Sequence, residues 1–377
     1  MTVFNEIRKL AEATTNDYLA QAARGGKKII GYFCSYVPEE MIHAAGAVPY
    51  RMRAVGSTGT ILGDTYFSSA NCSFVRRVLD SGLRGDFDFL DGIVFMNGCD
   101  HNRRLFDNWS YAHPDTGFNH MLFVPHGRSA ACLGQYLHEL GKFRGFLEER
   151  FGTGLTEEKL RESIGLYNRK RTLLREIADS RKAAALPISG TEFLALMLAV
   201  TAVPVEDAIA LLERVSAELR AGRVHTEKAA LRLFVTGSCL EELSHMELVE
   251  SAGAVVVADA ICLGARYFEH SVSGEGDPID ALARRYLRNL SCPRMMDDVH
   301  GRMAYAKETV AAFGIDAVIM EKLEFCSMMS GESYIGSHEL RKADIPSITL
   351  TRELYGGGVG QLKTRIQAFY EKVINRS

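Results

Sequence analysis

The 377-residue sequence lacks an excess of charge of either sign, a long apolar run and any CxxC pair of cysteines. Its 44 basic and 47 acidic residues nearly balance, which gives no electrostatic basis for binding nucleic acid or a membrane surface. No apolar run approaches the roughly 20 residues that a membrane-spanning helix needs, and the amino terminus lacks a basic and then apolar signal segment. We therefore expect a cytoplasmic chain that binds neither nucleic acid nor membrane.

A GxxxxGKS or GxxxxGKT loop, which would cradle nucleotide phosphates, is also missing. A run of glycines begins at Gly356, in GGGVG, between TRELY and a helical pattern. We interpret this run as a turn with a helix cap rather than as a phosphate loop. The sequence thus gives no sign that the chain binds ATP itself.

Hydrophobic residues make up 47% of the chain, which is ample for two domains with buried cores. Short apolar runs alternate with longer amphipathic stretches, as in parallel sheets wrapped by helices. The runs are continuously apolar rather than alternating, which predicts strands covered on both faces. The eight predicted strands are Lys28–Cys34, Ala47–Met52, Gly92–Met96, Met121–Pro125, Leu231–Thr236, Ala254–Ala258, Ala317–Met320 and Ser347–Leu350. The predicted fold is α/β, with two doubly wound parallel-sheet domains of Rossmann or flavodoxin type.

A long helical region separates the two halves. The segment Thr156–Ala185 opens with TEEK, in which a capping threonine is followed by acids, as at a helix start. Pro187 and nearby small residues interrupt this pattern, and a further helix is predicted from Pro204 to about residue 221. The predicted parts are an amino-terminal α/β domain (1–155), a helical connection (156–225) and a carboxyl-terminal α/β domain (226–377).

Eight cysteines are scattered through both halves: Cys34, Cys72, Cys99, Cys132, Cys239, Cys262, Cys292 and Cys326. Disulfides are not expected in a reducing compartment, and each thiol taken alone fits a small buried apolar side chain. Four cysteines, however, end or closely follow predicted strands: Cys34, Cys99, Cys262 and Cys326. Ligands of open parallel sheets bind beyond these strand ends. Since the spacing matches neither a structural zinc site nor a ferredoxin, the set suits a cluster or metal in an interdomain cleft.

The other positions are less distinctive. Cys72 lies in a loop before a helix that is predicted to start near Phe74. Cys132 and Cys239 lie at or inside predicted helix starts, where packing is the expected role.

Longer segments carry a resemblance to a known family. They are GYFCSYVPEEMIHAAGAVPYRM from Gly31, SSANCSFVRRVLDSGL from Ser68, FDFLDGIVFMNGCDHNRRLFDNW from Phe87, VVADAICLGARYF from Val256, NLSCPR from Asn289, DAVIMEKLEFCS from Asp316 and GVGQLKTRIQAFYE from Gly358. In this order, and over nearly the whole chain, they resemble the 2-hydroxyacyl-CoA dehydratase and benzoyl-CoA reductase superfamily. The likeness is greatest to its smaller cluster-bearing subunit, of the type found in benzoyl-CoA reductase.

The resemblance implies a [4Fe–4S] cluster that is bound by three cysteines and keeps one iron without a cysteine ligand. The segments ANCS, GCD and FCS match the family, so the resemblance implies that the cluster ligands are Cys72, Cys99 and Cys326. Thiolates are soft ligands that suit iron. Cys34 and Cys292 lie in family-like segments as well, so a larger cluster held by more cysteines stays open.

Other candidate residues carry weaker signals. Glu40, in a P-x-E segment, resembles a family glutamate near the substrate site and is the candidate general acid or base. The alternative is a carboxylate that stabilises the amino terminus of a helix. His101 and Arg103 closely follow Cys99 and are candidates for a hydrogen bond to a sulfur or to the phosphates of CoA, although solvation in a loop is the expected role of each. Arg76 and Arg77 are expected to be ordinary surface charges.

Three functions follow from the resemblance. The first is a role within an ATP-dependent benzoyl-CoA reductase, which adds low-potential electrons to the aromatic ring of a CoA thioester. The second is the equivalent role in a 2-hydroxyacyl-CoA dehydratase, a lyase, and the third is a non-catalytic electron relay in either complex. The basic stretch after Cys99 favours the reductase branch. The implied partners are a larger homologous subunit, a separate ATP-hydrolysing iron–sulfur activator and an aroyl-CoA or acyl-CoA substrate.

Overall fold

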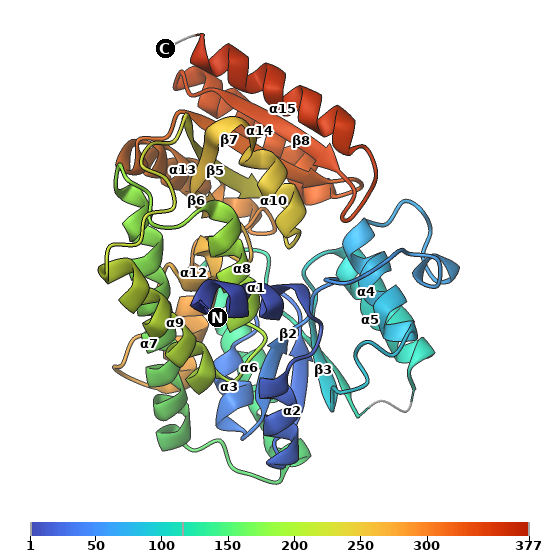
Figure 1. The fold of residues 1–377 in the computed structure, drawn as a ribbon. Helices are drawn as coiled ribbons and strands as arrows, with labels where there is room; N and C mark the ends of the chain where they lie inside the picture. The colour runs from blue at the N-terminus through green and yellow to red at the C-terminus, as the bar shows by residue number, and fades with distance from the viewer. Residues whose placement is uncertain (1, 115–116, 376–377) are drawn as a thin grey trace.

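The computed structural model describes residues 2–114 and 117–375 and contains two four-stranded parallel sheets (Figure 1). The first sheet has the order β2-β1-β3-β4 and consists of β1 (Ile29–Tyr32), β2 (Val48–Arg51), β3 (Gly92–Met96) and β4 (Asn119–Leu122). The second sheet has the order β6-β5-β7-β8 and consists of β5 (Leu231–Gly237), β6 (Ala254–Ala260), β7 (Ala317–Leu323) and β8 (Ser347–Arg352). All eight predicted strands and the predicted α/β class are confirmed, and both strand orders are of the flavodoxin type.

Helices flank both sheets (Figure 1). Those of the first half are α1 (Val3–Glu12), α2 (Asp17–Arg24), α3 (Glu39–Ala44), α4 (Ser73–Leu83), α5 (Asp100–Ala112) and α6 (Ala130–Phe151). The connecting helices are α7 (Glu157–Asp179), α8 (Gly190–Val200) and α9 (Val205–Arg220). Those of the second half are α10 (Leu243–Val249), α11 (Ala265–Phe268), α12 (Pro278–Arg288), α13 (Val299–Phe313), α14 (Ser327–Lys342) and α15 (Val359–Ile374). None of the helices in the described parts of the chain is both long and apolar enough to span a membrane.

Local sequence signals set several helix starts. The Thr156 side chain accepts a hydrogen bond from a backbone N–H of the first turn of α7, as predicted. Ser189 forms a capping box at the start of α8. Gly358 precedes α15 with a φ of 88°, a left-handed conformation that glycine adopts readily. The glycine run therefore forms the predicted turn and helix cap.

The central strands of the first sheet, β1 and β3, supply side chains to two cores. In β1 and β3, Ile29 and Ile93 face a core that contains Trp109 of α5, whose exposed fraction is 2%. The next residues along these strands, Ile30 and Val94, face the opposite core, which contains residues of α6 and α12. Two buried faces explain why the strands are continuously apolar in sequence.

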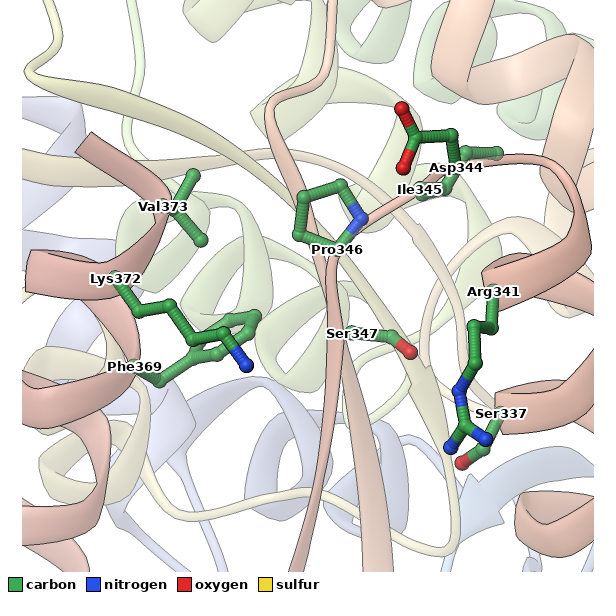
Figure 2. A pocket seen from close by; sticks show the side chains of 9 residues that line it. All are labelled: Ser337, Arg341, Asp344, Ile345, Pro346, Ser347, Phe369, Lys372 and Val373. Carbon is green, nitrogen blue, oxygen red and sulfur yellow. The ribbon is translucent and has the colours of Figure 1, made fainter. Parts of the chain in front are cut away.

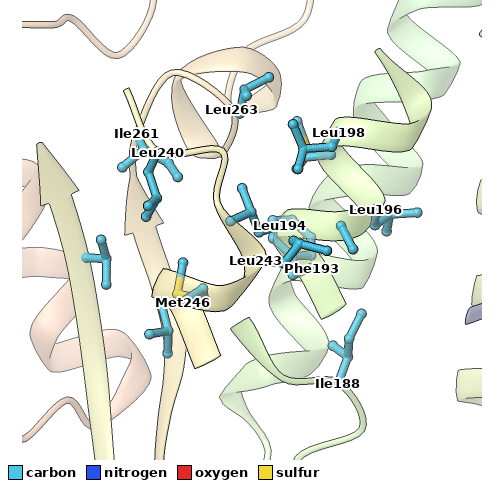
Figure 3. Close-up of a cluster of buried hydrophobic side chains, with 14 of the residues drawn as sticks. Ile188, Phe193, Leu194, Leu196, Leu198, Leu240, Leu243, Met246, Ile261 and Leu263 are labelled. Carbon is cyan, nitrogen blue, oxygen red and sulfur yellow. The ribbon is translucent and has the colours of Figure 1, made fainter. Parts of the chain in front are cut away.

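The two halves of the chain exchange helices. The amino-terminal α1 packs on α8, and its Val3 and Ile7 enter the core of the second sheet. In return, α12 of the second half packs on α6, and its Leu282 enters the core of the first sheet. Figure 3 shows part of the core of the second sheet, where Leu194 of α8 lies close to Leu243 of α10. The two sheets are therefore joined by packing as well as by the chain.

Loops beyond the carboxyl ends of the strands meet across the two halves. The Ser73 hydroxyl, at the start of α4, accepts a hydrogen bond from the backbone N of Leu354, just after β8, at 2.7 Å. The Glu241 carboxylate, after β5, accepts one from the backbone N of Ala54, after β2, at 2.6 Å. The loops that carry most of the cysteines therefore lie between the two sheets.

Candidate functional site

The three cysteines predicted to be cluster ligands each directly precede a helix. Cys72 is the N-cap of α4, Cys99 is the N-cap of α5, and Cys326 is the N-cap of α14. A helix amino terminus has unpaired N–H groups and the positive end of the helix dipole, both of which favour an anionic thiolate. We refer to Cys72, Cys99 and Cys326 as the first thiol group; two members come from the first half and one from the second.

The members of the first thiol group lie close enough for their charges to interact. Burial raises the pKa of the Cys72 thiol to about 12, and the neighbouring Cys99 and Cys326 thiols add to this shift. Burial also raises the pKa of Cys99, while backbone N–H groups in the first turn of α5 act in the opposite direction. The fold therefore brings the three side chains together, and their role as ligands stays a prediction.

His101 connects the Cys72 and Cys99 loops. Its Nδ1 accepts a hydrogen bond from the backbone N of Cys72 at 3.2 Å, which places the ring proton on Nε2. Burial lowers the pKa of His101, so the imidazole is neutral at neutral pH. The ring supports the backbone of the Cys72 loop, which the sequence does not indicate.

Arg76 and Arg77 are not the free surface charges that the sequence predicts. Arg77 is 9% exposed and donates to the backbone O of Tyr355 at 2.9 Å. Arg76 pairs with Asp64 at 3.0 Å and with Glu353 at 3.4 Å. The loop after β8 covers this part of α4. The contacts of Arg77 with Tyr355 and of Arg76 with Glu353 hold the Cys72 segment against the second half.

A cavity of about 470 Å³ lies beside the first thiol group. Its wall includes Cys99 and Ser327, the residue that follows Cys326. The remaining lining includes apolar side chains (Met296, Met328 and Ile335), Arg294, and two ion pairs, Arg103–Asp100 and Arg302–Glu332. Such a lining suits a ligand that has both an apolar part and negative charge.

A different cavity, of about 280 Å³, lies where β8 begins (Figure 2). Arg341 of α14 lies on one side of Ser347, and Lys372 of α15 lies on the other. Because the cysteines follow the ends of the strands, this cavity lies at the opposite edge of the second sheet from the first thiol group.

A second thiol group consists of Cys34, Cys262 and Cys292. The Ser35 hydroxyl donates to the backbone O of Cys262 at 2.8 Å, and the Tyr36 hydroxyl accepts from the backbone N of Cys292 at 3.4 Å. Burial raises the pKa of the Cys34 thiol to about 12, and the neighbouring Cys262 and Cys292 thiols add to this shift. The sequence places two of these cysteines at strand ends, but its spacing does not reveal that all three meet.

The predicted position of Cys239 at a helix start is wrong. Cys239 lies in the loop after β5, and α10 begins only at Leu243. The intervening residues bind the first half instead of forming a helical turn, since Glu241 accepts from the backbone N of Ala54. The Cys239 thiol donates to Glu241 at 3.6 Å. Burial raises the pKa of Glu241 to about 7, a feature that no sequence motif indicates.

Beneath the Cys326 loop, Glu321 forms a buried ionic network at the end of β7. Its carboxylate accepts from His245 Nε2 at 3.0 Å and from Arg352 Nε at 2.8 Å, and its exposed fraction is 0%. Burial acts to raise the pKa of Glu321, but His245 and Arg352 outweigh it and lower the pKa to about 2. The network holds the ends of β7 and β8 together.

This network predicts an acid-dependent loss of stability. The folded-state pKa of Glu321 lies below its ordinary value of 4.5, so its contribution is fully present above about pH 4.5 and is lost as the pH falls toward 2. The lost contribution is about 3 kcal/mol. Urea unfolding at several pH values should show a steeper acid-dependent fall in the free energy of unfolding for the wild type than for Glu321→Gln. Equal slopes would contradict the prediction.

Glu40, the predicted acid or base, lies in the first turn of α3 with an exposed fraction of 0%. Arg171 of α7 donates to Oε1 at 2.6 Å, and the Tyr286 hydroxyl of α12 donates to Oε2 at 2.7 Å. Burial acts to raise the pKa of Glu40, but the charges of Arg171 and Arg285 outweigh it and lower the pKa. The carboxylate thus joins three helices, and its catalytic role stays a prediction.

The chain belongs to the family described as "2-hydroxyglutaryl-CoA dehydratase, D-component", whose model matches residues 34–373. It is 26% identical over 353 residues to one of the subunits of benzoyl-CoA reductase from Thauera aromatica, with 92% of this chain and 91% of that protein covered. It is 27% identical over 362 residues to the beta subunit of lactoyl-CoA dehydratase from Anaerotignum propionicum, with 94% of each covered.

A third relative is the beta subunit of (R)-2-hydroxyglutaryl-CoA dehydratase from Acidaminococcus fermentans, at 24% identity over 379 residues, with 98% of this chain and 99% of that protein covered. The predicted superfamily is confirmed. All three relatives are named as enzyme subunits, and they include both predicted enzyme classes. The similar identities do not separate the reductase from the dehydratases.

Proposed function

We propose that the chain is the iron–sulfur subunit of a CoA-thioester enzyme, with the first thiol group as cluster ligands. The observation that carries this proposal is the convergence of three thiols, from both halves, at three helix amino termini beside a cavity. Membership of a family whose named relatives are CoA-thioester enzyme subunits supports the same function.

The donor set fits an iron–sulfur cluster. Three thiols are soft ligands, and each lies where the helix dipole favours its anionic form. Over residues 2–114 and 117–375, no three His, Cys, Asp or Glu side chains are placed to hold a single metal ion. A [4Fe–4S] cluster presents several iron atoms, so its thiolate ligands are spread more widely than the ligands of one ion. When bound, it supplies one-electron chemistry and an iron that has no cysteine ligand.

The side chains around the cavity would bind and shield the substrate. Arg294, which forms no ion pair among the described residues, would supply positive charge for the phosphates of CoA or for the thioester oxygen. Arg103 and Arg302 also line the cavity, but they pair with Asp100 and Glu332. Met296 and Ile335 supply apolar surface that keeps water away from the acyl part. The chain's own contribution is therefore to orient a CoA thioester beside the first thiol group.

Within this function we propose a benzoyl-CoA reductase subunit, supported by the basic stretch of α5 and by the similarity to the Thauera aromatica protein. A 2-hydroxyacyl-CoA dehydratase subunit is the alternative, supported by the similarity to the lactoyl-CoA dehydratase protein. In either complex, the proposed partners are a larger homologous subunit and a separate ATP-hydrolysing activator in the cytoplasm. If only the larger partner subunit binds the substrate, this chain would act as a non-catalytic electron relay.

Turnover of the co-purified complex without oxygen tests this proposal. Benzoyl-CoA and a 2-hydroxyacyl-CoA are supplied separately, with the activator, ATP and a reductant. We expect a dienoyl product from benzoyl-CoA, with electrons consumed in proportion to product. An enoyl product from the hydroxyacyl-CoA, with only trace reductant consumed, would instead establish the dehydratase. Turnover of neither substrate would contradict both assignments.

A further inference from the structure

The last strand of the second sheet, β8, has one edge that no other strand of the described residues covers. The strand order β6-β5-β7-β8 places β8 at an end of the sheet, where it pairs with β7. The backbone N of Val318 in β7 donates to the O of Pro346 at 2.9 Å, so Pro346 and every second residue after it face β7. The backbone N–H and C=O groups of Ser347, Thr349 and Thr351 therefore point away from β7. We call these groups the outer edge of β8.

The outer edge of β8 is accessible. Ser347, Thr349 and Thr351 are half-buried, whereas β6, at the other end of the sheet, is buried along its whole length. Arg365 of α15 donates to the Thr349 O at 2.8 Å, which agrees with the direction of this carbonyl group away from β7. The second sheet can therefore be extended by a further strand at β8 but not at β6.

The side chains of β8 do little to prevent such pairing. An exposed strand edge is usually protected by a charged side chain, a proline or a bulge. Ser347–Thr351 reads SITLT, which contains none of these and is rich in β-branched residues. The one charged residue of the strand, Arg352, is 5% exposed and pairs with Glu321 and Glu242. An extended peptide can add to an edge of this kind through main-chain hydrogen bonds.

The cavity of about 280 Å³ described above lies where the outer edge of β8 begins (Figure 2). Leu340 of α14 packs in the core on one face of the sheet, and Ile366 of α15 packs in the core on the other face. Arg341 and Lys372, from the same two helices, therefore approach Ser347 from opposite faces of the sheet, as Figure 2 shows. A strand added beside Ser347 would lie between these two cations.

The charges of the cavity favour an acidic occupant. Arg341 and Lys372 are exposed, and neither forms an ion pair or a side-chain hydrogen bond within the described parts of the chain. Asp344 is the one carboxylate of the lining, so the net charge of the wall is positive. Successive side chains of a strand point to opposite faces. Two consecutive acidic residues in an added strand would therefore meet Arg341 on one face and Lys372 on the other.

We propose that the outer edge of β8 binds an extended segment of another protein that carries two consecutive acidic residues. Main-chain hydrogen bonds to Ser347 and Thr349 would hold the segment, and ion pairs to Arg341 and Lys372 would set its register. A second copy of β8 is a poorer occupant because β8 contains no acidic residue. This inference goes beyond the proposed function, which concerns the first thiol group at the opposite ends of the strands.

Binding of a synthetic peptide to the full chain, purified without oxygen, tests the proposal. The probe is a fluorescent peptide of alternating valine and threonine with two adjacent glutamates at its centre, and the control peptide has two glutamines instead. Fluorescence anisotropy measures the dissociation constant. We expect it to be about tenfold higher for the glutamine peptide, and about tenfold higher for the variant Arg341→Gln/Lys372→Gln with the glutamate peptide.

Lys363→Gln is the matched control variant. Lys363 is also an exposed lysine of α15, but it lies in the second turn of the helix, whereas Lys372 lies in the last. This variant should bind the glutamate peptide as the wild type does. Absence of binding of the glutamate peptide, equal binding of the two peptides, or equal losses in the control variant would overturn the proposal.

Hydrogen exchange of the unsubstituted chain tests the main-chain contacts directly. The amides of Ser347 and Thr349 should exchange at least about tenfold more slowly with the glutamate peptide than without it. Thr349→Pro removes an outward N–H while leaving the ladder to β7 intact, so it should weaken peptide binding at an unchanged melting temperature. Unchanged exchange of these amides with the peptide bound would overturn the proposal. Protection that grows with protein concentration without peptide would show a second copy at this edge and would also overturn it. None of these results concerns iron content or turnover, so the proposed function stands or falls separately.

Discussion

Replacing Cys99 by alanine is expected to remove the iron of the first thiol group and to reduce turnover of the complex to the background level. Cys99 caps α5, lies close to Cys72 and Cys326, and forms part of the cavity wall. Without its thiolate, a three-cysteine cluster has only two protein ligands. We expect a loss of about four irons per chain, measured together with sulfide on protein purified without oxygen.

Cys132→Ala is the control, because Cys132 is also partly exposed in the first turn of a helix. It should keep the iron content and turnover of the wild type. Circular dichroism and thermal melting would verify that Cys99→Ala remains folded. A folded Cys99→Ala variant with wild-type iron content would refute the ligand role of this residue.

Replacing Glu40 by leucine is expected to lower the free energy of unfolding by about 3–5 kcal/mol. The change removes the carboxylate that pairs with Arg171 at 2.6 Å and leaves a guanidinium with an exposed fraction of 1% or less without its anion. The Nε of Arg171 already has no hydrogen-bond partner among the described residues, so little remains to compensate the charge. Chemical denaturation of the full chain measures the loss.

The double variant Glu40→Leu/Arg171→Met makes this test sharper. Replacing both members of a buried pair by apolar residues removes the unpaired charge, so the double variant should be clearly more stable than either single variant. Additive losses of stability would contradict the ion-pair account. The same double variant tests catalysis: if Glu40 is the general acid or base, the protein should be stable yet inactive. Full activity would exclude the catalytic role of Glu40.

The strands and many helix starts could be predicted because their causes are local. Strands buried on both faces must be apolar at successive positions, as in Gly92–Met96, and this pattern needs no knowledge of the partners. The N-cap of Thr156 depends only on the turn that follows it. The first thiol group was accessible from sequence through family-like segments rather than through spacing.

Features that depend on tertiary contacts could not be predicted in the same way. The burial of Arg77 depends on a loop almost 280 residues further along the chain. The extended backbone between Cys239 and Leu243 depends on contacts of Glu241 with the first half, which override the helical pattern of the sequence. The second thiol group depends on three loops meeting, and no local pattern encodes such a meeting.

The exchange of helices between the halves also affects how the chain can fold during synthesis. The apolar face of α1 is made first, yet it packs in a core with β5, β7 and the carboxyl-terminal α15. The direct partners of this face, α8 and α9, lie near the middle of the chain, so the face stays uncovered until residue 220 or so has been made, in contrast to a helix that packs within its own sheet. Contacts of such long sequence separation slow folding. The first thiol group includes Cys326, so its three thiols can meet only after β7 and the start of α14 have also been made.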